Sequence, residues 1–335
     1  MYNLLPRLGV NGRSIYVSLV NFFFMRTFHF AILGALLIGG LAACQPQSID
    51  SNADAATVFA ANQTDINNYV ISKGLSGTTS ASGLFFQTTV PSSSTVIPTF
   101  GQEIEFNYKL YVLNGQSNTG VTSTTAVTDK VVDSAYVTTS AYFPFFAGSL
   151  KSGLEEGIRK MHEGESAILI MPSLLAFGNV ASSDKAIPAN SPVRFDVTVR
   201  RARTEDQQID DYIATNKLVV TEKTPTGLRF IKTKDNPTGA TPTANQTITI
   251  NFAGKLLRAT TGFAGGTGTD TKTVGVLKYV PGFEEGLAKL RVGDKATVIF
   301  PSSLGYGATG AAQNQTYVIP PYSPLSFDLE VVSVK

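Results

Sequence analysis

Two pairs of adjacent glutamates, Glu155–Glu156 and Glu284–Glu285, are the residues of this sequence best suited to acid–base chemistry. Two carboxylates that flank a scissile bond can serve as general acid and general base, as they do in glycoside hydrolysis. Here each pair lies in a short segment with apolar residues at helical spacing, and adjacent residues of a helix point in different directions. We therefore interpret both pairs as negative charge in the first turn of a helix, where it suits the helix dipole.

Histidine, cysteine and glycine add little further chemistry. The sequence holds two histidines and one cysteine, Cys44, which excludes metal sites rich in histidine or thiolate and any disulfide within the chain. The glycine-rich stretch at 262–268 lacks the Lys-Ser/Thr of a phosphate-binding loop, and we expect a mobile flap there. No catalytic triad, no metal site and no cofactor is predicted.

The glutamate pairs belong to a segment that the chain carries twice. Residues 153–178 and 282–307 align without a gap and are identical at 12 of 26 positions. Upstream of each copy lies another matching pair of segments, 65–75 and 208–218, with apolar residues at helical spacing. A repeat of this extent indicates that the body of the chain is one structural unit written twice.

We place the two units at 62–203, called domain 1, and 204–335, called domain 2. Each has the pattern of a helix, two strands, a long loop, a short amphipathic helix, a strand, a loop and a last strand. A single helix among antiparallel strands is typical of an α+β fold. We predict that each domain is a bent antiparallel β-sheet wrapped around a short α-helix, with an extra N-terminal helix per repeat.

The chain before the repeats has the layout of an export signal. Arg26 is followed by an apolar run and then by the small residues that precede Cys44. The sequence "LAAC" resembles a bacterial lipobox. The resemblance implies removal of residues 1–43, with Met25 as an alternative start, and acylation of the Cys44 sulfur. A retained membrane helix is the alternative, although Arg26 interrupts its apolar stretch.

An acylated Cys44 implies a protein that is lipid-anchored to a bacterial membrane in the cell envelope, with its folded domains outside the cytoplasm. The polar residues that follow predict a flexible tether over 44–61. The formal charge of the chain is +2, and residues 1–43 contribute three arginines and no acid. The remainder is therefore near neutral and gives no electrostatic indication of a nucleic-acid partner.

The order of short motifs in both repeats resembles that of the FKBP-type peptidyl-prolyl isomerase family. Each repeat carries G-[F/L]-E-E-G, then P-S-x-L-x-[F/Y]-G, then I-P, and finally F-D-[V/L]. The resemblance covers most of residues 100–203 and 245–335. It implies a bent sheet around a short helix, which agrees with the periodicity. It also implies isomerisation of X–Pro bonds in proline-containing polypeptide clients, without a cofactor.

The resemblance also implies a pocket in each domain. The matching positions in domain 2 are Phe252, Val280, Phe283, Tyr306, Ile319 and Phe327. Those in domain 1 are Tyr108, Asp133, Leu154, Phe177, Ile187 and Phe195, and we expect Phe145 to form a wall of that pocket. In the family, the position of Phe283 forms the floor of the pocket, and the hydroxyl at the position of Tyr306 bonds a carbonyl of the ligand.

Each domain departs from the family pattern in its own way. Domain 1 keeps the acid at Asp133, but Leu154 replaces the aromatic floor and Phe177 has no hydroxyl. Domain 2 keeps the aromatic floor and the hydroxyl of Tyr306, but Ala264 aligns with the position of the acid. We therefore expect domain 2 to be the more active of the two.

The expected chemistry needs no nucleophile. Rotation about a peptide bond faces a barrier of about 18–20 kcal/mol because of amide resonance. The twisted amide has less charge separation than the planar one, so an apolar pocket favours it relative to water, and hydrogen bonds fix the neighbouring carbonyls. The alternative is a proline-segment-binding chaperone or assembly lipoprotein with weak catalysis, or a domain 1 that only spaces domain 2 from the membrane. The oligomeric state stays open.

Overall fold

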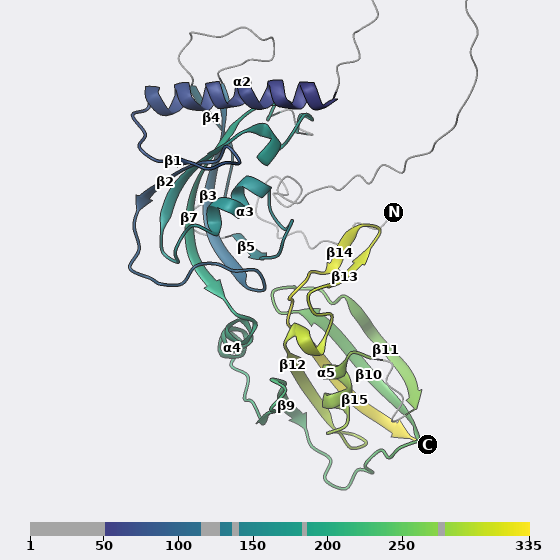
Figure 1. Ribbon diagram of the computed structural model, residues 1–335. Helices are drawn as coiled ribbons and strands as arrows, with labels where there is room; N and C mark the ends of the chain where they lie inside the picture. Colours follow the sequence, from purple (N-terminus) through teal and green to yellow (C-terminus); the bar gives the residue numbers. More distant parts are fainter. Residues whose placement is uncertain (1–50, 115–127, 136–140, 183–185, 274–278) are drawn as a thin grey trace, which may run out of the picture.

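The computed structural model describes residues 51–114, 128–135, 141–182, 186–273 and 279–335. The predicted signal segment, Cys44 and the first residues of the predicted tether lie outside these ranges. Within them, the chain forms two antiparallel sheets with helices against them, one sheet in each domain (Figure 1). In the described part of the chain, no helix combines the length and the apolar character that crossing a bilayer requires.

The sheet of domain 1 has seven strands in the order β1-β2-β6-β7-β3-β4, and β5 also pairs with β3. Every pairing is antiparallel. The strands are β1 (Thr78–Thr79), β2 (Phe85–Val90), β3 (Glu103–Asn114), β4 (Thr128–Ala135), β5 (Ala141–Pro144), β6 (Ser166–Met171) and β7 (Val193–Arg203).

The sheet of domain 2 has six strands in the order β11-β10-β15-β12-β9-β8, again antiparallel, and a separate hairpin pairs β13 with β14. The strands are β8 (Glu222–Lys223), β9 (Arg229–Lys234), β10 (Thr247–Leu256), β11 (Ala264–Thr273), β12 (Lys295–Phe300), β13 (Ala311–Gln313), β14 (Thr316–Ile319) and β15 (Leu325–Val334). Read from its other edge, this order is that of domain 1, so the predicted α+β fold and its duplication are confirmed. The expected flap at 262–268 is mostly strand, since β11 begins at Ala264 and pairs with β10.

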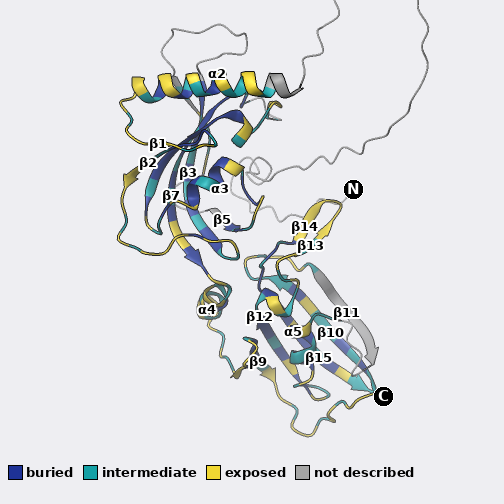
Figure 2. Cartoon of the chain, in the orientation of Figure 1, coloured by how far each residue is buried: buried dark blue, intermediate teal, exposed yellow. Residues whose placement is uncertain are grey.

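Each sheet buries one face against a short helix, as the dark interior strands of Figure 2 show. Helix α3 (Ser152–Ile158) lies in domain 1 and helix α5 (Pro281–Leu287) in domain 2. A Cβ atom at Gly157 would lie 2.4 Å from Leu169 Cδ1, and one at Gly286 would lie 2.5 Å from Val298 Cγ1. The last glycine of each G-x-E-E-G motif is therefore required because the helix approaches the sheet too closely for any side chain.

The glutamate pairs have structural partners. In the first turn of α3, the Glu155 carboxylate accepts a hydrogen bond from the N–H of Leu150 (3.0 Å). Glu284 accepts from the N–H of Tyr279 (3.2 Å) in the matching position of α5. This arrangement supports the interpretation as first-turn charge for Glu155 and Glu284, because their carboxylates satisfy backbone donors ahead of the helix. The second glutamates instead accept from the hydroxyls of Ser82 and Thr226.

The extra N-terminal helix of each repeat is also present. It is α2 (Ser51–Ser72) in domain 1 and α4 (Glu205–Thr215) in domain 2. Ile66 and Ile209, from the apolar spacing noted in the sequence, are buried against their sheets. Because α2 begins at Ser51, residues 51–61 are helical, which corrects this part of the predicted flexible tether; residues 44–50 lie outside the described ranges. Alanines in this stretch favour a helix, and Asn62 fixes it to the domain by a hydrogen bond from the N–H of Ser173 (2.7 Å).

Each N-terminal helix forms hydrogen bonds with a one-turn 3₁₀ segment, which follows β6 in domain 1 and β12 in domain 2. These segments are η1 (Ser173–Leu175) and η2 (Ser302–Leu304). In domain 2, the Glu205 carboxylate accepts from both the N–H and the hydroxyl of Ser302, the latter at 2.6 Å. Burial is the main cause that raises the pKa of Glu205, while the two bonds from Ser302 lower it. In domain 1 the neutral amide of Asn62 takes this place, because its oxygen accepts a hydrogen bond from the N–H of Ser173.

The contact between Glu205 and Ser302 generates a prediction for two variants. Glu205→Ala leaves the Ser302 N–H without its partner and should lower the free energy of unfolding by about 1–3 kcal/mol. Glu205→Gln should keep the contact and match or exceed the wild type at pH 7. Because the folded pKa of Glu205 is raised, the wild type loses stability as the pH rises from about 4.5 through that pKa, and Glu205→Gln does not. Urea denaturation at several pH values measures both effects. Equal loss in the two variants would contradict the prediction.

A buried carboxylate fixes the turn after each short helix. Asp294 is fully buried in domain 2, and it accepts from the N–H groups of Asn236 (2.5 Å) and Arg291 (2.9 Å). Burial opposes its ionisation, but these bonds and Lys232 at 3.2 Å lower the pKa of Asp294 below its ordinary value. Glu165 holds the matching position of domain 1, also with a lowered pKa.

Asp294→Asn should therefore lower the free energy of unfolding at pH 7 by about 1–3 kcal/mol. A carboxyl group with a depressed folded pKa stabilises the protein above its unfolded pKa and loses this contribution as the pH falls through the folded value. The difference between wild type and variant should thus shrink below about pH 4. Urea denaturation followed by circular dichroism at pH 7 and pH 3 measures it, and a difference that stays constant would count against the assignment.

Candidate functional site

An aromatic cluster lies at the start of α5 in domain 2. The ring of Phe283 is buried and stacks on Tyr279, with the ring centres 4.1 Å apart. Phe252 of β10 and Phe327 of β15 meet it edge to face, at 5.4 Å and 5.2 Å. The helix thus places one aromatic ring against two strands of the sheet, an arrangement that edge-to-face geometry stabilises.

Two further rings extend the cluster around Phe327. Phe300 stacks on it at 5.8 Å from the next strand, and Phe263 meets it edge to face at 5.7 Å. Ile319 is buried in the same cluster, and Val280 packs against it. The structure therefore brings together five of the six residues that the sequence singled out in domain 2.

Tyr306, the sixth, lies differently. It follows η2, and 38% of the residue is exposed. Its position depends on the turn that Glu205 holds, because the N–H of Gly307 bonds the carbonyl of Ser302 (2.8 Å). Tyr306 is thus a partly exposed residue on an anchored turn. Glu205 was not identified from the sequence, since nothing in the helix pattern shows that it reaches a turn about a hundred residues away.

Tyr279 was also missed as a member of the cluster. The resemblance directs attention to Val280 and Phe283 on either side of the helix start, and Tyr279 directly precedes them. The only available signal was an aromatic residue next to the helix start in domain 2, where domain 1 has Leu150.

The matching residues of domain 1 form a closed core. Tyr108, Phe145, Leu154, Phe195 and Ile187 are all buried in one cluster, in which Tyr108 and Phe195 have ring centres 5.9 Å apart. Leu154 occupies the place of Phe283 at the start of the short helix. Phe177 is only half-buried, and the Nζ of Lys151 lies 5.0 Å from the centre of its ring. Burial lowers the pKa of Lys151.

Asp133 lies beside Tyr108. The Tyr108 hydroxyl donates to its Oδ2 at 2.7 Å, and the N–H of Ser134 donates to its Oδ1 at 2.8 Å. Burial first, and then the negative charge of Asp133, raise the pKa of Tyr108 well above its usual range. The pair therefore keeps the tyrosine protonated and fixes β3 to β4.

The strand register shows what replaces this pair in domain 2. Asp133 is opposite Leu110 across β3 and β4. Leu110 and Gly254 hold matching places, since they are opposite Phe195 and Phe327. Gly254 is opposite Ala264, so an alanine holds the register position of the acid, as the sequence comparison predicted. Domain 2 also has Phe252 in place of Tyr108, which removes the hydroxyl that an acid would accept from.

The cluster of domain 2 is apolar and carries no group suited to covalent chemistry. Its members are aromatic and aliphatic, and its one hydroxyl belongs to Tyr279. Among the residues that the structure describes, no three side chains of His, Cys, Asp or Glu are grouped as metal ligands.

A separate cleft of about 640 Å³ lies between the domains, from Thr99–Gln102 to Lys223–Gly227. None of the pocket residues named from the sequence lines it. Two of its charged residues already serve the fold, because Glu205 bonds Ser302 and Asp206 bonds Arg229 at 2.6 Å. We therefore do not assign the cleft to the site.

Comparison with known proteins agrees with the motifs. A family model described as FKBP-type peptidyl-prolyl cis-trans isomerase matches residues 95–200 and 239–332. The chain is 30% identical over 113 residues to the macrophage infectivity potentiator of Trypanosoma cruzi, covering 34% of this chain and 56% of that protein. It is 30% identical over 111 residues to the probable FKBP-type peptidyl-prolyl cis-trans isomerase FkpA of Neisseria meningitidis, covering 33% and 39%. The match therefore spans about half or less of these relatives.

Two solved structures are also matched, each with a low TM-score. The crystal structure of the three FKBP domains of wheat FKBP73 matches with 19% identity and a TM-score of 0.34, covering 76% of this chain and 96% of that one. That of FkpA from Escherichia coli matches with 25% identity and a TM-score of 0.33, covering 39% and 59%. On the strength of the family model, which matches both repeats and more than half of the chain, the chain belongs to the FKBP-type peptidyl-prolyl cis-trans isomerase family and carries the family domain twice.

Proposed function

We propose that this protein catalyses the cis–trans isomerisation of X–Pro bonds in polypeptide clients, and that domain 2 is the more active site. The observation that carries the proposal is the aromatic cluster around Phe283, at the place where the family has the floor of its pocket. Domain 2 combines this ring with the half-exposed hydroxyl of Tyr306.

The physical basis is differential solvation. Water stabilises the planar amide more than the twisted one, because the planar amide carries the larger dipole. Aromatic rings that hold the proline and exclude water remove this preference and lower the barrier of about 18–20 kcal/mol. A hydrogen bond from Tyr306 to a neighbouring carbonyl would orient the client without any covalent step.

Domain 1 offers a poorer site by the same criteria. Leu154 presents no ring, Phe177 donates no hydrogen bond, and the ammonium of Lys151 lies over the ring of Phe177 at 5.0 Å. A charged group beside the place that a proline would occupy keeps water there, which works against the twisted amide. We therefore assign domain 1 a weaker role in turnover.

Exchanging residues between the matching positions tests this assignment. Tyr306→Phe in the full-length chain should lower kcat/KM for a proline peptide about five- to tenfold, the worth of one hydrogen bond in the transition state. The matched control Phe177→Tyr, which adds the hydroxyl in domain 1, should leave kcat/KM within about twofold. Protease-coupled peptide turnover measures both. If Tyr306→Phe leaves turnover unchanged, the proposed role of Tyr306 in domain 2 is wrong.

A chaperone that binds proline segments without turnover is the second candidate. The departures of both domains from the family pattern motivate it, since Leu154 replaces the aromatic floor in domain 1 and Ala264 holds the place of the acid in domain 2. The same peptide measurement separates the two functions. Binding of a proline peptide without acceleration over the uncatalysed rate would establish the chaperone and reject the isomerase.

We further propose that Cys44 carries a lipid that attaches the protein to a bacterial membrane, with both domains outside the cytoplasm. The support is the sequence "LAAC" after a short apolar run that follows Arg26.

Growth of the producing bacterium with radiolabelled palmitate should label the wild-type protein, whereas Cys44→Ser should carry no label and should leave the membrane fraction. A Cys44→Ser protein that stays in the membrane fraction would instead indicate a retained apolar helix.

A further inference from the structure

We propose that domain 1 is a positioning part of the site in domain 2. Glu103 and Phe146 of domain 1 hold the two segments of domain 2 that flank its aromatic cluster. This inference rests on the proposed function for its effect on turnover, although the contacts that it invokes are independent of that function. The two segments are the turn at 257–263 and the hairpin of β13 and β14.

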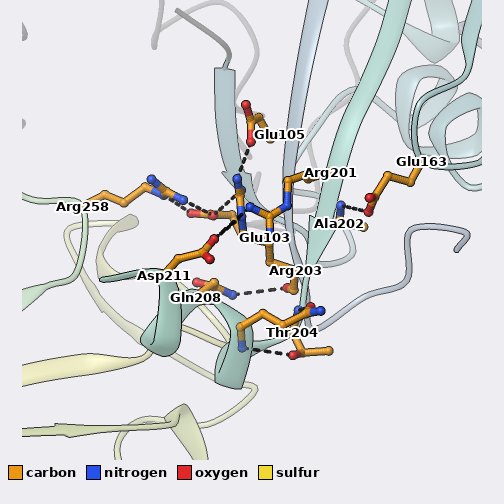
Figure 3. A network of polar contacts seen from close by, with 11 residues as sticks. Glu103, Glu105, Glu163, Arg201, Ala202, Arg203, Thr204, Gln208, Asp211 and Arg258 are labelled. Carbon is orange, nitrogen blue, oxygen red and sulfur yellow. Dashed lines mark hydrogen bonds and ion pairs between the residues drawn. The ribbon is translucent and has the colours of Figure 1, made fainter. Parts of the chain in front are cut away.

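The first contact is an ion pair between the domains (Figure 3). The guanidinium of Arg258, in the turn after β10, bonds both carboxylate oxygens of Glu103 in β3, at 2.5 and 2.6 Å. The Glu103 side chain is 8% exposed and that of Arg258 is 45% exposed. A two-pronged pair between planar groups fixes direction as well as distance, so the turn is held in one orientation.

Domain 1 supplies the buried residues at the receiving end of this pair. Arg203 at the end of β7 is buried and bonds Glu103 at 3.2 Å. Its Nε also donates to Asp211 of α4 at 2.9 Å. The ring of Tyr142 lies 5.6 Å from the guanidinium of Arg203 and 4.0 Å from that of Arg258. A cation over an aromatic face adds to the charge pair, and a network of this kind is worth more than an isolated surface pair.

The turn that Arg258 fixes leads directly to the cluster. Leu257 packs with α4, and at the far end of the turn the N–H of Phe263 donates to the carbonyl of Gly254 at 2.9 Å. The ring of Phe263 then meets Phe327 edge to face. Phe263 is half-buried, so it lies at the rim of the cluster, where a client would contact it.

The second contact is between two rings. Tyr317 of β14 meets Phe146 of domain 1 edge to face, with ring centres 5.5 Å apart. The hairpin ends at Ile319, which is buried in the cluster. Phe146 directly follows Phe145, whose ring is fully buried in domain 1. The hairpin that carries Ile319 therefore rests on a rigid part of the other domain.

Through these two contacts, domain 1 supports the segments on both sides of the aromatic cluster of domain 2. An isolated surface ion pair contributes little, but here the constrained segments are the turn of Phe263 and the hairpin of Ile319. Loosening either segment would let water into the cluster, which the proposed mechanism must exclude. If the two contacts only joined the domains, removing either contact would leave the conformation of both segments unchanged.

The test uses the full-length chain with Arg258→Gln and Phe146→Ala, each compared with the wild type. Arg258→Lys keeps the charge but not the two-pronged geometry. Arg291→Gln is the matched control, since this arginine of domain 2 bonds only the carbonyl of Pro237 with its side chain (2.8 Å). Hydrogen exchange of residues 257–263 and 311–319 is measured beside kcat/KM for a proline peptide and its affinity.

Arg258→Gln should speed exchange in 257–263 about tenfold by opening the turn locally. It should lower kcat/KM about fivefold, the size expected for a lost charge-assisted pair. Arg258→Lys should give exchange rates and kcat/KM between those of Arg258→Gln and the wild type. Phe146→Ala should likewise speed exchange in 311–319 and lower kcat/KM. The double variant Arg258→Gln/Glu103→Gln should lose less than the sum of the two single losses, because the two changes share the ion pair; Glu103→Gln alone also weakens the contact with Arg203.

Unchanged exchange in both segments would overturn the inference, and so would faster exchange with kcat/KM and peptide affinity equal to those of Arg291→Gln. A wild type that binds the peptide without turnover would refute the proposed isomerase instead. Exchange and peptide affinity would then decide the inference on their own.

Discussion

The close approach of a short helix to a sheet is the constraint on which the rest of each domain depends. Gly157 and Gly286 face strand side chains at distances that leave no room for a Cβ. At this spacing, the first turn of the helix places its third residue against the last strand, so that Phe283 meets Phe327 at 5.2 Å. A larger residue at either glycine would force the helix or the facing strand side chains to shift. The geometry of the site thus follows from the absence of a side chain.

The duplication made most of the fold predictable. Two copies of one pattern reveal which positions must be apolar, and the G-x-E-E-G motif marks where the helix meets the sheet. Contacts between distant segments could not be predicted in the same way. The bonds from Ser302 to Glu205, the stacking of Tyr279 and the pairing of Arg258 with Glu103 depend on side-chain geometry that no local pattern encodes. The helix from Ser51 was missed because polar composition suggested a tether, whereas burial of Ile66 and the bond from Ser173 to Asn62 fix it to domain 1.

The two domains show how one architecture is maintained with different chemistry. In domain 1 Asp133 accepts a hydrogen bond from Tyr108, whereas domain 2 has Ala264 and Phe252 at the matching positions, and Phe252 packs against Phe283. Asn62 and Glu205 support the same turn with an amide and with a carboxylate. Only Thr204 separates the last strand of domain 1 from α4. A connection this short gives the domains little freedom, which makes the polar network around Arg203 effective (Figure 3).

The strand order has a consequence for biosynthesis. In each sheet a central strand comes last in the sequence: β7 lies between β3 and β6, and β15 lies between β10 and β12. A nascent chain that leaves the ribosome from its N-terminus must therefore wait for residue 203 before domain 1 can close, and for residue 334 before domain 2 can. Pairings of such long range form slowly. A polypeptide that has to pass a translocation channel unfolded would keep that state longest with this order of strands, because its sheets stay split until the final segment arrives.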